Sequence, residues 1–443
     1  MAEKKGLRHL FGDIKPDERI PVFLMLVNVT IILVAYYVIK VVREPLILSS
    51  EGGAAWKSYS AAAQALLLIG YVPLYGWFSS KVNRMNLILG MNLFFLINIE
   101  LFSLAVKLNV PYIGIAFFIW VGIFSLSVIA QFWSLANDIY TEDQGKRLFP
   151  VIAIGATLGS PVGSYLASYL FESGLAAQNI LHISAGLLVV SMLIYWLTQR
   201  NESDAAAVKK EKTEEKLSAT NGFTLVVRSR YLLLIAALML LLNVVNATGE
   251  YILGAKVVEH AEAALKLDPS INVDAYIGTF YGDYFFVVNI VALLLQTFVV
   301  SRIVKYFGIK GVLLALPLVA LGAYTTVAAG VGMAIVRWMK TAENATDYSV
   351  MNTARAMLWL PTTREEKYKA KQAIDTFVVR IGDMVSAGVI FVGLTWFQLK
   401  ATGFALVSIV VILVWLGIAL LLLKEYGRLA ALSEEQKLET DSA

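Results

Sequence analysis

The stretch PVFLMLVNVTIILVAYYVIKVV, residues 21–42, decides the class of fold. It is apolar almost throughout, and at 1.5 Å per residue a helix of this length crosses about 30 Å of hydrocarbon. Basic residues precede it at Lys4, Lys5, Arg8, Lys15 and Arg19. No small-residue cleavage site follows it, so we expect a retained membrane span and not a cleaved signal peptide.

Similar apolar blocks continue along the rest of the chain. Of 443 residues, 58% are hydrophobic and 16% are charged, a balance that a water-soluble core of this size does not hold. We therefore predict an all-α membrane protein with about twelve transmembrane helices. The predicted spans are 21–42, 59–79, 86–106, 111–138, 148–171, 178–198, 231–259, 275–300, 309–328, 330–352, 368–397 and 401–423.

A charged stretch divides these spans into six and six. Residues 200–221 mix lysine and glutamate and contain no aromatic side chain, which is typical of a linker. The predicted domains are a cytoplasmic N-terminal amphipathic segment (1–20), an N-terminal six-helix bundle (21–199), a cytoplasmic linker (200–230), a C-terminal six-helix bundle (231–424) and a cytoplasmic tail (425–443). A solvated tail is the alternative for the first segment.

Positive charges predict the orientation in the membrane, because lysine and arginine gather on the cytoplasmic side. In alternate loops they are Lys81, Arg84, Lys146, Arg147, Arg302, Lys305, Lys310, Arg364, Lys367, Lys369 and Lys371. The loops between these hold mostly Glu51, Glu172, Glu259, Glu262, Asp268 and Asp274. We expect a multi-pass protein of the bacterial inner (cytoplasmic) membrane with both termini in the cytoplasm.

The two halves are similar to each other in one loop. Ser80-Lys81-Val82-Asn83-Arg84 resembles Ser301-Arg302-Ile303-Val304-Lys305, and each follows the second predicted span of its half. Gly76 followed by Lys81 and Arg84 is a loose form of the loop that is typical of the major facilitator superfamily. That resemblance implies two six-helix bundles that rock about a site at the membrane midplane.

Charged side chains inside the predicted spans mark the candidate site. Each costs at least about 2.5 to 3.5 kcal/mol near the bilayer centre, so it usually faces a cavity or a partner. Near the end of the first span, Tyr36, Lys40 and Arg43 share one helix face. The alternative is that Lys40 and Arg43 extend to the outer interface.

The tenth predicted span is the most unusual segment. Arg337, Lys340, Asn344 and Asp347 repeat at intervals of three and four residues, with Glu343 beside them. Such a stripe must face water or protein. The structural alternative pairs Arg337 or Lys340 with Glu343 and Asp347 as ion pairs between helices.

Two sets of candidate residues result from these and the other spans. The candidate substrate-binding residues are Tyr36, Lys40, Arg43, Asn137, Asn246, Glu250, Arg337, Lys340, Asn344, Asp347 and Arg380. The candidate gating or ion-pair residues are Glu100, Asp138, Lys256, Asp283, Glu343, Asp375 and Asp383. For Arg380 and Asp383 the three-residue spacing also allows an internal pair.

The cations among these residues predict an anionic substrate, because a cavity of positive potential concentrates anions. Arginine also offers forked donors that suit phosphate and carboxylate. The histidines, His9, His182 and His260, have no metal-ligand spacing, and the chain has no cysteine. We expect no enzymatic activity, no bound metal and no cofactor.

Glycines repeat at four-residue spacing at Gly155, Gly159 and Gly163, and again at Gly278 and Gly282. No strand precedes them, as a phosphate-binding loop would require. They predict close helix packing, since small residues let helix backbones approach each other in a membrane.

Two blocks of sequence carry a family resemblance. The first is Phe132-Trp133-Ser134-Leu135-Ala136-Asn137, followed by Lys146-Arg147-Leu148-Phe149 and Gly155-Ala156-Thr157-Leu158-Gly159. The second is Glu343-Asn344-Ala345-Thr346-Asp347-Tyr348-Ser349, followed by Pro361, Lys367-Tyr368-Lys369-Ala370-Lys371, Ile374-Asp375 and Arg380-Ile381-Gly382-Asp383. Over nearly its whole length the chain resembles the ATP/ADP translocase (nucleotide transporter, Tlc-type) family of bacteria and plastids.

The resemblance implies a major-facilitator fold and the exchange of nucleotides, with cationic residues on the phosphates. By position, Lys40 and Arg43 would be phosphate partners from the first half. Arg337, Lys340 and Arg380 would be partners from the second half. The chain has Arg43-Glu44-Pro45 where family exchangers tend to have Lys-Asp, and it is shorter than most of them, which indicates a divergent bacterial branch.

The leading hypothesis is a secondary transporter that moves a nucleotide or a related phosphorylated anion by alternating access, as ATP/ADP-type exchange. One alternative is a proton-coupled carrier of another organic solute that uses Glu100, Glu250 or Asp375 as its titrating carboxylate. Another is a non-transporting sensor or scaffold with the same fold. The expected partners are a small anionic substrate and the lipid bilayer, without nucleic acid, and the chain is expected to be a monomer.

Overall fold

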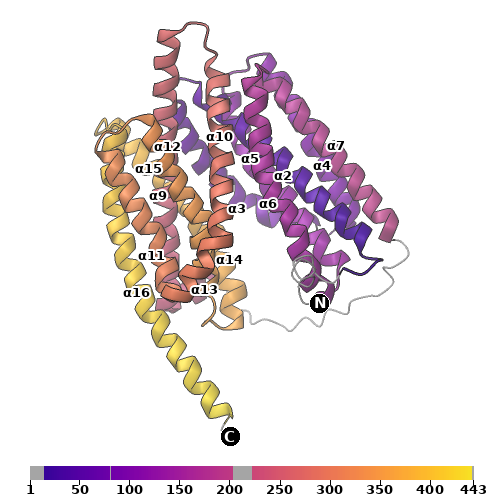
Figure 1. Ribbon diagram of the computed structural model, residues 1–443, viewed down its shortest axis with the longest axis vertical. Coiled ribbons are helices and arrows are strands. Elements are labelled where there is room, and N and C mark those ends of the chain that lie inside the picture. Colours follow the sequence, from indigo (N-terminus) through magenta and orange to yellow (C-terminus); the bar gives the residue numbers. More distant parts are fainter. Residues whose placement is uncertain (1–13, 80, 203–221, 442–443) are drawn as a thin grey trace, which may run out of the picture. The chain divides into compact units, whose positions relative to one another are not determined.

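The structure is almost entirely helical. The computed structural model describes residues 14–79, 81–202 and 222–441, and within these ranges it contains no β-strand (Figure 1). The prediction of an all-α protein with about twelve membrane helices is confirmed. Residues 1–13 of the predicted amphipathic segment and 203–221 of the predicted linker lie outside the described residues.

The first half consists of long helices joined by short turns. They are α2 (Arg19–Leu48), α3 (Gly53–Ser79), α4 (Arg84–Lys107), α5 (Ile113–Ile139), α6 (Glu142–Glu172) and α7 (Ala177–Glu202). Helix α3 begins at Gly53, earlier than the predicted start at residue 59. Lys57 is therefore a helical residue and not part of a loop.

The second half contains α-helices interrupted by π-helical segments. In order they are α8 (Gly222–Arg228), α9 (Arg230–Leu267), α10 (Val273–Leu294), η1 (Leu295–Val299), α11 (Val300–Ala328), α12 (Met333–Thr346), η2 (Asp347–Met351), α13 (Asn352–Leu358), η3 (Glu366–Ala370), α14 (Lys371–Ala373), η4 (Ile374–Val378), α15 (Val379–Thr395) and α16 (Ala401–Asp441). The π-helical segments were not predicted from the sequence.

Ten helical runs among the described residues are long and apolar enough to cross a membrane. Two predicted spans, 275–300 and 309–328, belong to one of these runs, Val273–Ala328. Its backbone turns at Gly308, which has a φ of 59° that glycine adopts without steric cost. The predicted span 330–352 is helical as well, but it is too rich in charged residues to count among the ten.

The chain divides into two compact units that do not follow the sequence halves. One unit contains the described residues of 1–51, 70–213 and 264–287, and the other contains those of 52–69, 214–263 and 288–443. Helices α3 and α10 each contribute to both units. The division into bundles at the linker stays a prediction.

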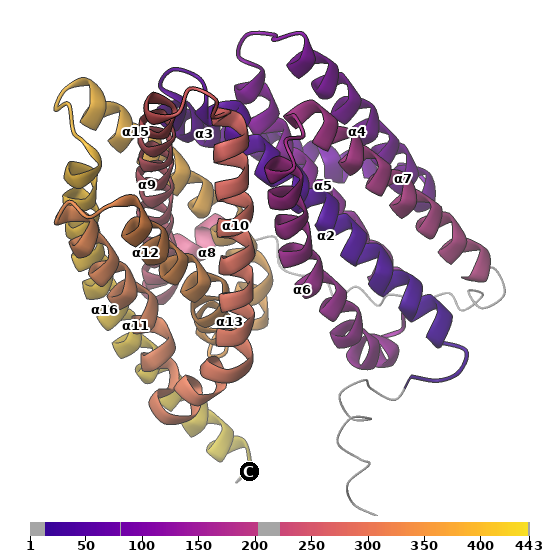
Figure 2. The same ribbon diagram turned by 45° about the horizontal axis from the view of Figure 1, so that its top comes forward.

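Within the first unit, α2 and α6 run side by side, as Figure 2 shows. A Cβ atom on Gly155 would lie 2.5 Å from the carbonyl oxygen of Leu26, and one on Gly163 would lie 2.6 Å from that of Val34. Real Cβ atoms essentially never approach backbone so closely. The glycine stripe therefore brings the two helix backbones together, and the prediction of close packing is confirmed.

The second pair of glycines packs α10 against α6 in the same unit. A Cβ atom on Gly278 would lie 2.5 Å from the ring of Phe171, and one on Gly282 would lie 2.7 Å from the backbone nitrogen of Ser168. Small residues on α10 thus leave room for the C-terminal end of α6.

Replacing Gly159 by alanine is expected to destabilise the protein. The added methyl group would lie 2.6 Å from Cβ of Leu33 and 2.8 Å from the carbonyl oxygen of Thr30. Overpacking of this kind costs about 1–3 kcal/mol, which thermal unfolding in detergent would show as a lower Tm. Gly186→Ala on α7 is the control, because its Cβ has no neighbour within 4 Å. Equal Tm values for the two variants would contradict close packing at Gly159.

A charged clamp joins the first turns of α2 and α6. Glu18, which is 5% exposed, accepts hydrogen bonds from Nη1 and Nη2 of Arg147 at 3.2 and 2.9 Å. The side chain of Gln144 and the backbone nitrogen of Lys15 donate to it at 3.2 and 3.0 Å. These donors, Arg147 above all, favour the charged carboxylate and lower the pKa of Glu18 below its ordinary value.

The lowered pKa of Glu18 makes the stability of this clamp dependent on pH. The contribution of the charged Glu18 side chain to the stability of the fold is complete above the ordinary carboxyl pKa. It is lost as the pH falls through the lowered pKa. We expect Glu18→Gln to lower the Tm by a few degrees at pH 7 and by less in acid of about pH 3. The exposed neighbour Asp17 provides the control as Asp17→Asn. A Tm difference that stays constant with pH would contradict the clamp.

Candidate functional site

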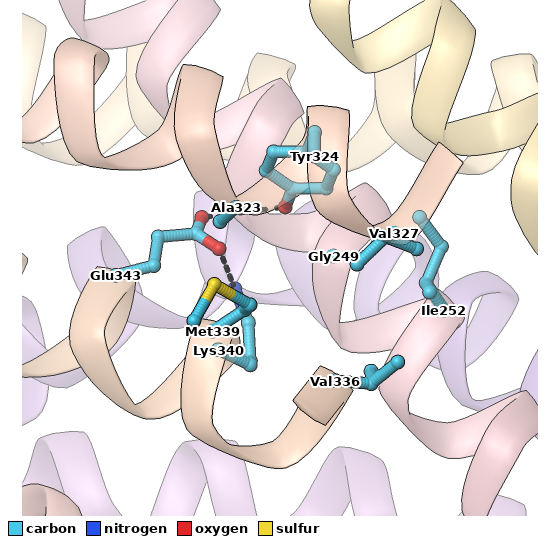
Figure 3. Close-up of a pocket in the computed structure, with 9 residues that line it drawn as sticks. All are labelled: Gly249, Ile252, Ala323, Tyr324, Val327, Val336, Met339, Lys340 and Glu343. Atoms are coloured by element: carbon cyan, nitrogen blue, oxygen red, sulfur yellow. Dashed lines mark hydrogen bonds and ion pairs between the residues drawn. The ribbon is translucent and has the colours of Figure 1, made fainter. Parts of the chain in front are cut away.

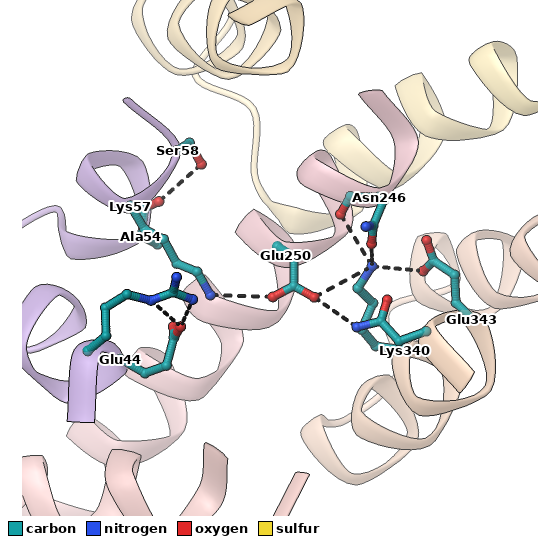
Figure 4. A network of polar contacts seen from close by, with 10 residues as sticks. Glu44, Ala54, Lys57, Ser58, Asn246, Glu250, Lys340 and Glu343 are labelled. Carbon is teal, nitrogen blue, oxygen red and sulfur yellow. Dashed lines mark hydrogen bonds and ion pairs between the residues drawn. The ribbon is translucent and has the colours of Figure 1, made fainter. Parts of the chain in front are cut away.

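A buried lysine forms the centre of the candidate site. Lys340, on α12, is 4% exposed, and its Nζ donates to Oδ1 of Asn246 on α9 at 2.7 Å and to the Asn246 backbone oxygen at 3.2 Å (Figure 4). The carboxylate of Glu343, one turn further along α12, lies 3.2 Å from Nζ. A buried ammonium group is thus surrounded by oxygen acceptors, as a low-dielectric environment requires.

Helices α9 and α12 place matching polar pairs opposite each other. Asn246 and Glu250 are one turn apart on α9, as Lys340 and Asn344 are on α12. The amide of Asn344 donates to Oε1 of Glu250 at 3.1 Å, and the same oxygen lies 3.8 Å from Nζ of Lys340. The stripe predicted on the tenth span therefore faces the polar pair on α9.

Lys57 completes the network, and the sequence reasoning missed it. This lysine, on α3, is 6% exposed, and its Nζ lies 3.4 Å from Oε2 of Glu250. Figure 4 shows Lys57 and Lys340 on opposite sides of Glu250. The available signal was a lysine just before an apolar run, and it was lost because the run was taken to begin after it.

Cations and carboxylates alternate along this network, which we call the charge chain: Lys57, Glu250, Lys340 and Glu343. The two positive and two negative groups compensate one another. Buried ions in a bilayer are tolerated when they are paired in this way. The arrangement can also exchange partners, because an anion that enters competes with the carboxylates for the ammonium groups.

A small cavity lies beside Lys340 (Figure 3). Its volume is about 10 Å³, room for roughly one water molecule. The hydroxyl of Tyr324 lies 2.9 Å from the carbonyl oxygen of Val245 and 3.3 Å from Glu343. A Cβ atom on Gly249 would lie 2.0 Å from the Tyr324 hydroxyl oxygen and 2.9 Å from Nζ of Lys340, so the charge chain needs glycine there.

Other predicted residues of the second half lie in separate pairs. Asp347, the first residue of η2, accepts a hydrogen bond from Nη2 of Arg355 at 2.9 Å. Arg380 contacts Asp383 at 3.4 Å, and Asp383 also accepts from Nδ2 of Asn243 at 2.7 Å. The internal pair that the spacing of Arg380 and Asp383 allowed is present.

The remaining predicted residues of this half occupy less buried positions. Lys256 contacts Glu259 at 2.7 Å, and Asp375 contacts Lys371 at 3.5 Å. Arg337 is half-buried on α12. A role for these three residues in binding or gating stays a prediction.

In the first unit, the two predicted cations of α2 contact aromatic rings. Nζ of Lys40 lies 4.1 Å from the ring centroid of Phe285 and 5.0 Å from that of Tyr37. The Arg43 guanidinium lies 4.2 Å from the ring centroid of Phe118. Cations over ring faces are stabilised by about 0.5–2 kcal/mol, so aromatic residues support both charges within the helix bundle.

Arg43 also pairs with its neighbour. Its Nε donates to Oε1 of Glu44 at 3.1 Å, and Glu44 is fully buried. Tyr36 is half-buried and its ring meets that of Tyr37 edge to face, with centroids 5.2 Å apart. The Arg43-Glu44 sequence that departs from the family pattern is therefore an internal ion pair here.

The other predicted residues of the first unit form local pairs. Glu100 contacts His182 at 2.7 Å, and Asp138 pairs with Arg84. Asp283 accepts a hydrogen bond from Oγ of Ser168 at 2.6 Å. The list is completed by the exposed residue Asn137.

No group of three or more histidine, aspartate or glutamate side chains that could hold a metal ion occurs among the residues that the structure describes.

The candidate site in the second unit consists of Lys57, Asn246, Glu250, Lys340, Glu343 and Asn344.

The helical architecture resembles that of known transporters. The nucleoside transporter NupG matches with a TM-score of 0.61 and 11% identity, covering 90% of this chain and 98% of that chain. The POT family transporter PepTSo matches with a TM-score of 0.62 and 12% identity, covering 92% of this chain and 98% of that chain. The fold is that of the major-facilitator type of membrane transporter.

The sequence identifies the group within this class. The family model described as TLC ATP/ADP transporter matches residues 111–323 and 323–426. The chain belongs to the TLC ATP/ADP transporter family and is a membrane transporter.

Curated relatives carry related names. "ADP,ATP carrier protein 1" of Chlamydia pneumoniae is 23% identical over 366 residues, which cover 72% of this chain and 68% of the relative. "ADP,ATP carrier protein 4" of Rickettsia bellii is 23% identical over 342 residues, which cover 68% of this chain and 65% of the relative. The chain thus matches about two thirds of the length of these relatives.

Removing the central cation is expected to destabilise the protein strongly. Lys340→Met leaves Glu250 and Glu343 close together without the ammonium group between them, which costs about 3–5 kcal/mol for a buried pair. Adding Glu343→Gln to this variant should recover much of the loss, because one uncompensated charge is removed. Chemical denaturation or Tm in detergent measures both effects.

The control for this prediction is Lys256→Met, which breaks an exposed ion pair worth roughly 0–1 kcal/mol. If Lys340→Met were no more harmful than Lys256→Met, the charge chain would not stabilise the fold.

Proposed function

We propose that the protein exchanges nucleotides of the ATP/ADP type across the membrane by alternating access. Membership of the TLC ATP/ADP transporter family and the names of the relatives support this substrate class. The single observation that carries the proposal is the buried Lys340, held by exchangeable oxygen partners inside a membrane helix bundle.

Glu250 links two cations that suit a phosphate group. Lys57 and Lys340, from α3 and α12, lie 3.4 and 3.8 Å from its two carboxylate oxygens. A phosphate group carries more charge than one carboxylate and accepts several hydrogen bonds at once, so it competes with Glu250 for both ammonium groups. Substrate binding in this proposal releases Glu250 from the charge chain.

In this proposal the same exchange of partners accompanies alternating access. Without substrate, the ammonium groups are neutralised by Glu250 and Glu343, so the unoccupied site avoids an uncompensated buried charge. With substrate, the phosphates replace part of this compensation. The family resemblance adds Lys40 and Arg43 as further phosphate partners, and in the first unit both cations lie over aromatic rings.

Nucleotide binding is tested by thermal stabilisation of the detergent-purified protein with ATP, ADP, other nucleotides, dicarboxylates and inorganic phosphate. A ligand at 100 times its Kd stabilises by about 2.7 kcal/mol. We expect ATP and ADP to raise the Tm and Lys57→Gln to weaken their apparent affinity at least tenfold, since that change removes one ammonium group. Lys266→Gln, at an exposed lysine near the end of α9 and outside the charge chain, should bind as the unaltered protein does.

Proteoliposomes test the exchange itself. Uptake of labelled ATP should require ADP or ATP inside the vesicle. A Tm shift with another anion and none with nucleotides would contradict nucleotides as the substrate and indicate that anion instead. An apparent nucleotide affinity that is unchanged in Lys57→Gln would place the nucleotide site outside the charge chain.

Proton coupling is the second candidate, because Glu250 and Glu343 are membrane carboxylates that share Lys340. Neutralising one of them would release the ammonium group as entering phosphate does. Uptake that is driven by a pH gradient and abolished in Glu250→Gln would favour this function over exchange.

The proposed location is the bacterial inner membrane, with a monomeric chain and both termini in the cytoplasm. The alternation of basic and acidic loops supports this orientation. The chain has no cysteine, so a single cysteine introduced near either terminus shows by labelling in intact cells on which side of the membrane that terminus lies. Labelling by a reagent that cannot cross the membrane would contradict the proposed orientation.

A further inference from the structure

A second, larger cavity lies in the first unit, between the C-terminal end of α6 and the first turns of α10. Its volume is about 420 Å³, within the range of small-molecule sites. The argument uses six of its lining residues, namely Phe171, Glu172, Asn272, Tyr276, Phe280 and Asp283. None of them belongs to the charge chain.

The cavity is acidic. Glu172 and Asp283 line it, and no lysine or arginine is among its described lining residues. Glu172 is exposed and ends α6, where the helix dipole adds negative potential. Asp283 is half-buried and lies ten residues after Val273, about 15 Å along α10 at the usual rise per residue. One carboxylate of the lining is thus exposed and the other half-buried.

Asp283 is held in a fixed orientation. Oγ of Ser168 on α6 lies 2.6 Å from its Oδ1. The close contact between α6 and Gly282 keeps these two helices together at this level. The carboxylate is consequently preorganised before any ligand arrives, which lowers the entropic cost of binding.

Aromatic rings complete the lining. Tyr276, Phe280 and Asp283 follow one another at four and three residues, so they form one stripe along α10. Phe171 contributes a ring from α6. Ring faces attract cations, and best of all ammonium groups that carry alkyl substituents, because the rings also cover apolar surface.

We propose that this cavity binds an organic cation of the alkylammonium class, with its charged nitrogen on Asp283 and its carbon atoms against Tyr276 and Phe280. The ring lining favours such a ligand over a bare metal ion, which prefers an all-oxygen shell. The site is separate from the anion site proposed above and does not rest on nucleotide exchange. It gives the transporter a second binding position of opposite charge preference.

The test uses tetraethylammonium chloride as the probe on the detergent-purified full chain, with ionic strength held constant by sodium chloride. We expect a saturable rise in Tm. Asp283→Asn should weaken the apparent affinity at least tenfold, because asparagine still accepts from Ser168 but carries no charge. Glu51→Gln removes an exposed carboxylate outside the cavity and should leave the affinity unchanged.

Glu172→Gln provides a second variant in case Asp283→Asn does not fold, because its side chain is exposed at the end of α6. We expect it to weaken binding of the probe severalfold. The proposal is overturned if tetraethylammonium gives no saturable shift, or if neither Asp283→Asn nor Glu172→Gln weakens it. A shift with magnesium chloride alone would also overturn it, in favour of a metal site.

Discussion

Lipid offers no hydrogen bonds and little dielectric screening, so every charge inside this helix bundle needs a partner supplied by the protein. The charge chain of Lys57, Glu250, Lys340 and Glu343 is the clearest result of that constraint. It fixes how α3, α9 and α12 face one another within their unit. In the proposed function an anion enters by replacing one of these internal partners, so that stability and binding depend on the same contacts.

The hydrophobic pattern predicted the helices well, because the length of an apolar run is set by membrane thickness and leaves little choice of structure. The run before residue 59 is less apolar, and the pattern therefore placed Lys57 outside the helix. The π-helical segments could not be predicted either. They depend on tertiary packing and leave no periodic signal in a single sequence.

For the site, helical spacing placed Lys340 and Asn344 on a common face, and in the structure both contact the α9 pair of Asn246 and Glu250. It could not predict which face meets which, because partner choice between helices is not encoded in local spacing. Asp347 illustrates the limit, since it shares the predicted stripe but pairs with Arg355 where η2 changes the helical register. Lys40 was predicted as a phosphate partner, and its aromatic surroundings were visible only in three dimensions.

Gly249 contributes to the site through its lack of a side chain. The space that a methyl group would fill there is taken by the Tyr324 hydroxyl and by the ammonium group of Lys340. Position 249 therefore accommodates only glycine as long as Tyr324 and Lys340 keep their places. Charge swaps elsewhere in the network can be balanced by a second swap, whereas a side chain at this position would displace the Tyr324 hydroxyl and the Lys340 ammonium group together. A change at this one position therefore disturbs both ends of Lys340's surroundings, the tyrosine beside the small cavity and the ammonium group itself.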